Sequence, residues 1–226
     1  MAITRRDWIK GSLAALGTFS GAKALGAICG ITHAQGEGPY YPERDLNRDN
    51  DLTQILPGGA SAKGQVLDLT GQVTNAQCRP IAGALVEIWQ AAASGKYNHS
   101  QDPNPLPADP NFQYWGRTRT DANGNYRFRS IIPGHYPLDP RLTGIEPTGP
   151  GQYRPPHIHF KVHAPGFQSL TTQMYFDPKS YDDADLAKTV SDLNRWENVD
   201  PTLTVLFADT GGIRVGSFDI TLRQTP

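Results

Sequence analysis

Two histidines separated by one residue are the strongest chemical signal in this sequence. The segment 154–160 reads Arg-Pro-Pro-His-Ile-His-Phe, which places His157 and His159 directly after two prolines. On a β-strand, residues two apart project from the same face, with Cα atoms about 6.6 Å apart. Two imidazole nitrogens at that separation can bind one metal ion. The alternative is a pair of polar residues on a solvated strand face, and the pattern alone leaves both open.

Further ligands would have to come from tyrosine, aspartate, glutamate or cysteine elsewhere in the chain. His163 shares the face of the pair but lies about 13 Å beyond His159, too far to share an ion. Cupin sites, which also use His-x-His, need a glutamate a few residues later, and none stands between 160 and 181. The His-Glu-x-x-His pattern of zinc proteases and the Gly-x-Ser-x-Gly elbow are also absent.

Short apolar and β-branched segments must position these residues. In 65–73, Leu67, Leu69 and Val73 share one face, which is typical of a half-buried strand. Asp-Ala-Asn-Gly-Asn at 121–125 is a turn sequence, and it predicts that its flanking strands form a hairpin. One helix is predicted from about 182 to 197, with Leu186, Val190 and Leu193 on one side. We predict an all-β fold, a single β-sandwich with long loops, its strands at 65–73, 84–90, 117–120, 126–131, 157–163, 170–176, 203–207 and 214–222.

Composition supports this fold class. The 226 residues include 23 Gly and 19 Pro, scattered without a repeat, which argues against a helical bundle, a coiled coil or a collagen-like rod. Four Trp, nine Tyr and eight Phe provide bulk for a core, so disorder is not expected. With 21 basic against 22 acidic residues there is no basic excess for nucleic acid. Two proline-rich stretches, 98–112 and 133–156, have no predicted strand or helix, and loops of that length are usually functional.

Residues 1–34 are predicted to be an N-terminal export signal, followed by one domain at 35–226. Arg5 and Arg6 precede a weakly apolar Gly/Ala-rich run from 11 to 31, which is too weak and, through Lys23, too interrupted for a membrane span. The paired arginines resemble a twin-arginine signal, so we expect a periplasmic or secreted protein that is not bound to the membrane after processing.

The cleavage position decides the fate of one of only two cysteines. Small residues precede possible cuts after Gly26 and after Ala34. If the cut follows Gly26, Cys29 survives and can form a disulfide with Cys78 in an oxidising compartment. If it follows Ala34, Cys78 is a lone thiol, and the sequence leaves the choice open.

The chain resembles the intradiol ring-cleavage dioxygenases, non-haem ferric enzymes that open catechols between the two hydroxyls. It looks most like the protocatechuate 3,4-dioxygenase branch, in particular the iron-bearing β chain. The resemblance runs from about Cys29 to Leu222. It rests on motifs in the family's order: Glu37-Gly38-Pro39-Tyr40-Tyr41, Val86-Glu87-Ile88-Trp89-Gln90, Gly95-Lys96-Tyr97, Tyr126-Arg127-Phe128-Arg129, Ile132-Pro133-Gly134-His135-Tyr136, Arg154 to Phe160 and Thr172-Gln173-Met174-Tyr175-Phe176.

The resemblance implies that Tyr97, Tyr136, His157 and His159 bind one Fe(III) per chain, a set of hard phenolates and imidazoles that suits ferric iron. It also implies that Tyr136 leaves the iron when substrate binds. Arg154 matches an arginine proposed to stabilise negative charge on the substrate, and Gln173 matches a glutamine near that arginine.

Substrate and assembly are less defined. His135 stands where we expect the most similar relatives to carry Pro, and Leu138 stands where the protocatechuate branch tends to carry Trp. We favour a protocatechuate-like diol and O₂ as substrates, and the chain could form a homo-oligomer or pair with a related iron-free chain. Two other functions remain open at this level: a non-catalytic, transthyretin-like binding module, and another metal enzyme that uses the histidine pair with a carboxylate.

Overall fold

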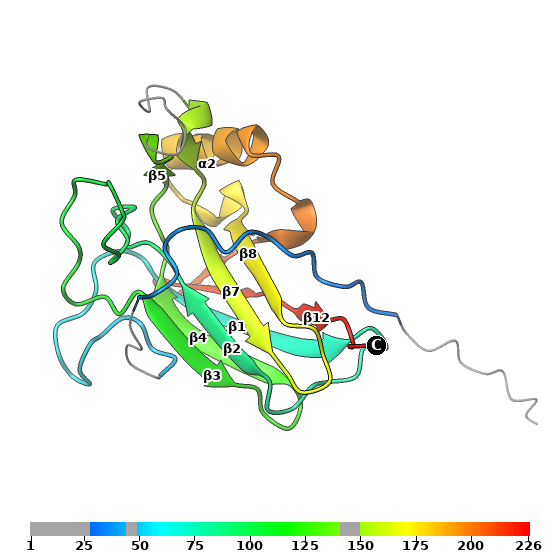
Figure 1. Ribbon diagram of the computed structural model, residues 1–226. Helices are drawn as coiled ribbons and strands as arrows, with labels where there is room; N and C mark the ends of the chain where they lie inside the picture. The colour runs from blue at the N-terminus through cyan, green and yellow to red at the C-terminus, as the bar shows by residue number, and fades with distance from the viewer. Residues whose placement is uncertain (1–27, 44–48, 141–149) are drawn as a thin grey trace, which may run out of the picture.

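Two five-stranded sheets pack face to face in the computed structural model, which describes residues 28–43, 49–140 and 150–226 (Figure 1). The first sheet runs β10 (Ala208–Thr210), β11 (Ile213–Ser217), β1 (Val66–Asn75) and β12 (Ile220–Leu222), with β4 (Asn125–Ile131) also paired to β1. The second runs β3 (Trp115–Arg119), β2 (Leu85–Trp89), β7 (His157–His163), β8 (Leu170–Phe176) and β9 (Thr204–Val205). The predicted all-β sandwich is confirmed.

The core lies between the two sheets and follows the alternation of the strands. Leu67 and Leu69 of β1 are fully buried there, as are Ile158 and Phe160 of β7. Because alternate strand residues point to opposite faces, the histidines at 157 and 159 project from the other face of β7, away from this core. That face is where the site is built.

The predicted hairpin at 117–131 is wrong. The turn itself forms, since Gly124 N–H donates to the Asp121 carbonyl at 3.0 Å. The strands on its two sides then separate, because β3 pairs with β2 in one sheet and β4 pairs with β1 in the other. The physical reason is the core: Tyr126 and Phe128 of β4 pack into the space between the sheets and are better buried there than on an isolated ribbon.

One end of the sandwich carries the helix and the short elements (Figure 1). The predicted helix is confirmed as α2 (Ala184–Trp196), capped by Asp183, whose side chain accepts from Leu186 N–H. Val190 and Leu193 are buried as expected, whereas Leu186 is exposed. The sequence missed the two-residue strands β5 (Tyr136–Pro137) and β6 (Tyr153–Arg154), which pair with each other. Short 3-10 helices complete the chain: η1 (Pro150–Gln152), η2 (Pro178–Ser180) and η3 (Pro201–Leu203).

Residues 28–41, named here the N-terminal strap, cross the outside of β7 and β8 (Figure 1). Cys29 forms a disulfide with Cys78, so the pairing that the sequence left open is present. Hydrogen bonds attach the strap further along, from Thr32 N–H to the Thr221 carbonyl at 3.1 Å and from Gln35 N–H to the Thr171 carbonyl at 2.9 Å. The strap is therefore packed as part of the domain.

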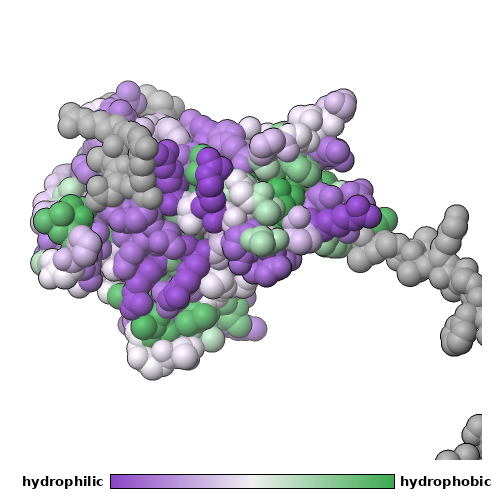
Figure 2. All heavy atoms as spheres, turned by 90° about the horizontal axis from the view of Figure 1, so that it is seen from below, coloured by the Kyte–Doolittle hydropathy of each residue, from purple (hydrophilic) through white to green (hydrophobic). Residues whose placement is uncertain are grey.

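The outer surface fits the balanced composition. In the face that Figure 2 shows, hydrophilic side chains cover most of the area, and apolar ones form separate groups. None of the helices in the described part of the chain is long and apolar enough to cross a membrane. The segment predicted to be an export signal lies largely outside the described residues, which begin at position 28.

Candidate metal centre

Four side chains meet on the outer face of β7. His157 Nε2 lies 3.1 Å from His159 Nε2 and 3.4 Å from Tyr136 Oη. His159 Nε2 lies 3.2 Å from Tyr97 Oη. All four residues are almost completely buried. The structure thus brings together the four residues that the resemblance implied, from three separate parts of the chain.

The donor atoms suit a metal ion. The Nδ1 atom of His157 lies 2.7 Å from the Pro155 carbonyl, which can only accept, so Nδ1 carries the proton and Nε2 presents its lone pair to the site. At separations of 3.1–3.4 Å each phenol can hydrogen-bond to a histidine Nε2 without metal, and a bound cation would replace those phenol protons. Four ligands about 2.0–2.1 Å from one centre in a tetrahedron are about 3.3 Å apart, which agrees with these separations. Two phenols and two imidazoles are a donor set for ferric iron.

No carboxylate joins this set. Among the residues that the structure describes, no group of three or more His, Cys, Asp or Glu is placed to hold a metal. The alternative in which a hydrolase pairs the two histidines with an acidic ligand therefore finds no ligand in the described ranges.

Two glycines hold the tyrosine-bearing segments against each other. Gly134 N–H donates to the Ala92 carbonyl at 3.0 Å, and a Cβ on Gly134 would lie 2.4 Å from the Ala93 carbonyl oxygen. Gly95 has φ +79°, and a Cβ there would lie 2.3 Å from the His135 carbonyl oxygen. Backbone meets backbone at this point, which is how Tyr97 and Tyr136 come within 5.3 Å, ring centre to ring centre.

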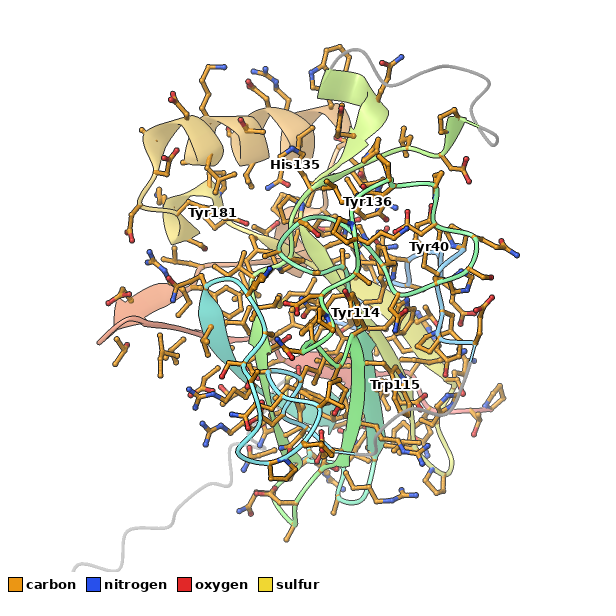
Figure 3. The ribbon with its side chains drawn as sticks, turned by 90° about the vertical axis from the view of Figure 1, so that its left-hand side faces the viewer. Tyr40, Tyr114, Trp115, His135, Tyr136 and Tyr181 are labelled. Atoms are coloured by element: carbon orange, nitrogen blue, oxygen red, sulfur yellow. A yellow bond between two sulfur atoms is a disulfide. The ribbon has the colours of Figure 1, made fainter. Side chains whose placement is uncertain are left out.

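An aromatic wall surrounds the donors. Trp89 of β2 lies opposite His159 in the strand register, and the two rings stack at 4.6 Å. Tyr40 of the strap packs 4.8 Å from Tyr97 and 6.1 Å from Tyr136, the latter pair visible in Figure 3. Gly38 of the strap has φ +72° and leaves room for His159, because a Cβ there would touch its Cε1 at 3.4 Å. The wall leaves little of the four donor residues exposed to solvent.

Burial holds all four donors in their uncharged forms when no metal is present. It raises the pKa of Tyr136 to about 12 and that of Tyr97 well above 10. Burial, together with the charge of Arg154, lowers the pKa of His159 to about 3 and that of His157 well below 6.5. The imidazoles are therefore ready to bind a cation, while the phenols must each release a proton to do so.

Arg154 and Gln173 lie together beside the donors. The Arg154 Nη2 group donates to Gln173 Oε1 at 2.7 Å, and Gln173 Nε2 donates to the Gly36 carbonyl of the strap at 2.7 Å. Burial alone would lower the pKa of Arg154, but Tyr136 and Glu197 outweigh it and raise that pKa, so the guanidinium stays charged. Gln173 thus lies beside Arg154, where the resemblance placed it.

Three other histidines lie outside the donor set. His163 contacts Ser169 Oγ at 2.7 Å, and His99 packs near Tyr40. His135 is half-buried, its pKa is lowered by burial, and its ring meets Tyr153 edge-on. Leu138 is partly buried next to β5.

Sequence reasoning missed Glu197, Tyr175 and Trp89 as parts of the site. Tyr175 shares the β8 face of Gln173, which was a usable signal. The role of Trp89 depends on the register between β2 and β7, and that of Glu197 on where α2 ends, so neither could be found from spacing.

Comparison with known proteins agrees with the family resemblance seen in the sequence. A family model described as "Dioxygenase" matches residues 36–222. The protocatechuate 3,4-dioxygenase beta chain of Burkholderia cepacia is 41% identical over 140 residues, 61% of this chain and 56% of that protein. Catechol 1,2-dioxygenase 2 of Acinetobacter lwoffii is 38% identical over 163 residues, 71% of this chain and 56% of its own. The chain thus spans little more than half the length of these relatives.

Two solved structures share the architecture. The dioxygenase domain of a dioxygenase–carbohydrate-binding fusion from Streptomyces sp. SirexAA-E superposes with a TM-score of 0.59 at 29% identity, over 87% of this chain and 100% of that domain. The 3-chlorocatechol 1,2-dioxygenase of Rhodococcus opacus 1CP gives a TM-score of 0.63 at 24% identity, over 86% of this chain and 73% of its own. At that identity the second likeness concerns the fold alone.

Proposed function

This chain belongs to the intradiol ring-cleavage dioxygenase family, and from that premise we propose that it is a non-haem Fe(III) enzyme. Its reaction would cleave a catechol-type diol between the two hydroxyls with O₂, giving a cis,cis-muconate that contains both oxygen atoms. One observation carries the proposal: two phenol oxygens and two imidazole nitrogens converge at 3.1–3.4 Å in a buried site.

Tyr97, Tyr136, His157 and His159 would hold one iron per chain. Bound ferric iron would supply the Lewis acidity and redox chemistry that let an aromatic diolate react with O₂. The protein's part is to keep four donors neutral or ready to ionise, and to shield them with the aromatic wall. Both follow from burial.

Tyr136 and Arg154 would handle charge during turnover. Tyr136, once displaced by the diol, would take a substrate proton on Oη, because burial raises its pKa to about 12 and a free phenolate is then a strong base at neutral pH. Arg154 would stabilise negative charge on the substrate from a fixed, largely buried position, an effect worth a few kcal/mol of barrier height in comparable sites. Gln173 would help to orient the arginine.

A protocatechuate-like substrate is favoured by the relative that is a protocatechuate 3,4-dioxygenase beta chain. A catechol 1,2-dioxygenase among the relatives makes catechol the main competitor. Leu138 stands where the protocatechuate branch tends to carry Trp. The smaller side chain changes the volume next to β5, so catechol remains a candidate substrate beside protocatechuate.

The test is to incubate iron-loaded protein with protocatechuate, catechol and hydroxyquinol under ¹⁸O₂. Two labelled oxygen atoms in a ring-opened muconate support the proposal, and the preferred diol identifies the substrate. Tyr97→Phe and His159→Ala are expected to lose iron and the phenolate-to-iron absorption band, whereas His163→Ala, on the same strand outside the site, keeps both. A colourless zinc protein, or no turnover of any diol, contradicts the proposal.

We also propose export by the twin-arginine route with cleavage after Gly26. The Cys29–Cys78 disulfide supports export and this cleavage position, because disulfides are typical of oxidising compartments and a cut after Ala34 would remove Cys29. Mass spectrometry of the exported protein should give a chain that begins at Ala27, and replacing Arg5 and Arg6 with lysine should retain it in the cytoplasm. A mature chain that begins at Gln35 contradicts the proposed cleavage position.

The assembly proposal follows from the resemblance to a beta chain: the protein forms a homo-oligomer or pairs with an iron-free chain. All four donors come from this one chain, so a partner would shape the substrate pocket rather than supply iron ligands. Light scattering on the purified protein, alone and after co-purification from its source, separates the two arrangements.

A further inference from the structure

The end of helix α2 reaches the site through one acidic side chain. Arg154 Nε donates to Glu197 Oε2 at 2.7 Å, and Arg154 Nη2 lies 2.5 Å from Glu197 Oε1. Both carboxylate oxygens of Glu197 are thus engaged by one guanidinium, which is the geometry that fixes the plane of an arginine. Tyr175 Oη adds a contact of 3.1 Å to the same carboxylate.

The position of Glu197 is itself held from two sides. Asn194 Nδ2 donates to the Phe176 carbonyl at 3.0 Å, which joins the last turn of α2 to the end of β8. Trp196 packs against Gly151, where a Cβ would lie 3.3 Å from its ring, just before β6 and Arg154. The helix end therefore has a fixed place relative to both strands that carry the arginine network.

A carboxylate at this place is unfavourable for the helix alone. The C-terminal end of a helix carries partial negative charge, so Glu197 at the C-cap is repelled unless a cation compensates it. Arg154 is that cation, and its charge also lowers the pKa of both site histidines. The Arg154–Glu197 ion pair thus connects the end of α2 to the positive charge that acts on the site histidines.

We infer that Glu197 is a positioning residue for Arg154 in the proposed dioxygenase reaction. Glu197, at the end of α2, accepts from Nε and Nη2 of Arg154, and Gln173 of β8 also accepts from Nη2. These contacts give the guanidinium a single orientation. None of these contacts involves Nη1. The inference rests on the proposed function for its kinetic meaning.

A double-mutant cycle tests the inference. Glu197→Gln keeps the shape and one acceptor but loses the charge, and we expect kcat to fall by about tenfold with KM changed less than about twofold, since a misplaced catalytic group costs rate rather than binding. Iron content and the absorption band should stay unchanged. Arg154→Ala should lower kcat by about a hundredfold, and adding Glu197→Gln to it should have almost no further effect, because Glu197 acts through Arg154.

The matched control is Asp192→Asn, which lies on the same helix and pairs with Lys188 and Arg195 at the surface. It should leave kcat unchanged. An equal loss from Glu197→Gln in the wild-type and Arg154→Ala backgrounds, or no loss at all, overturns the inference.

A structural measurement separates this inference from the proposed function. In a crystal structure of Glu197→Gln, Arg154 should leave its place against Gln173, while the four donors stay where they are. If the wild-type protein cleaves no diol, the proposed function fails, and this crystal structure still decides the positioning claim. An Arg154 side chain that keeps its contact with Gln173 in the variant overturns it.

Discussion

A histidine that binds a metal must present a neutral ring, and burial provides this for His159 before any metal arrives. The ring stacks on Trp89, and its Nδ1 atom has no hydrogen-bond partner within the part of the chain described here. Its pKa falls to about 3, first through burial and then through the Arg154 charge. The same surroundings that prepare the ring for metal make its protonation costly.

This cost predicts acid sensitivity of the metal-free protein. The unfolded chain protonates His159 near pH 6.5 and the folded chain only near pH 3, so in between the unfolded state binds more protons and stability falls as pH falls. Between pH 7 and pH 5, His159 alone should lower the free energy of unfolding by about 2 kcal/mol. Urea unfolding of chelator-treated protein at several pH values measures this.

The control is His159→Gln, which has no titrating group at this position. Its unfolding free energy should depend less on pH than that of the wild-type protein over the same window. Equal slopes for the two proteins would show that His159 is not held neutral by the fold.

At the scale of elements, the close approach of the segments around Gly95 and Gly134 decides whether the two tyrosines meet. Gly95→Ala combines a positive φ with a Cβ only 2.3 Å from a carbonyl oxygen, which the backbone cannot accommodate without moving. We expect the free energy of unfolding to fall by about 2–4 kcal/mol. Iron occupancy, measured by metal analysis, should fall with it.

Gly83→Ala is the matched control for that substitution. Gly83 has φ +73° but no atom within 4 Å of a Cβ placed there, so only backbone strain remains. It should cost about 1 kcal/mol and leave iron content unchanged. A similar loss of iron in both variants would mean that backbone strain at a positive φ, and not the contact with the His135 carbonyl oxygen, lowers iron occupancy.

The elements also show how far sequence reasoning reaches. Alternation identified β1 and the face that the histidines of β7 share, and apolar spacing identified α2. The hairpin failed because Asp121–Asn125 specifies a turn but not which sheet each flanking strand joins. Glu197 was missed because its partner, Arg154, lies more than forty residues earlier in the chain, and only the packing of α2 on β8 and η1 brings them together. Long-range packing of this kind leaves no local pattern.

For the whole molecule, the N-terminal strap connects the disulfide to the site. The Cys29–Cys78 bond closes a segment of 49 residues, and the strap then continues to Gly38 against His159 and Tyr40 against Tyr97. Loss of the bond should lower the free energy of unfolding by about 4 kcal/mol in the chain-entropy treatment. Thermal unfolding with and without a thiol reductant measures the effect.

The double variant Cys29→Ser, Cys78→Ser is the control, since a reductant should not change its midpoint temperature. Reduction of the wild-type protein should bring its midpoint close to that of the variant. An unchanged wild-type midpoint after complete reduction, verified by thiol titration, would contradict the prediction.

The pairing of β1 has a consequence for how the protein is synthesised. β1 starts at residue 66, and its parallel partners β11 and β12 lie at 213–222. While a ribosome is still translating, those partners are absent or inside the exit tunnel, so one edge of β1 stays open and the first sheet cannot close over the core beneath the histidines. The nascent chain must therefore wait for its last strand, and a chain that stops short of it would be released with the donor residues present but with the first sheet, and so the core, incomplete.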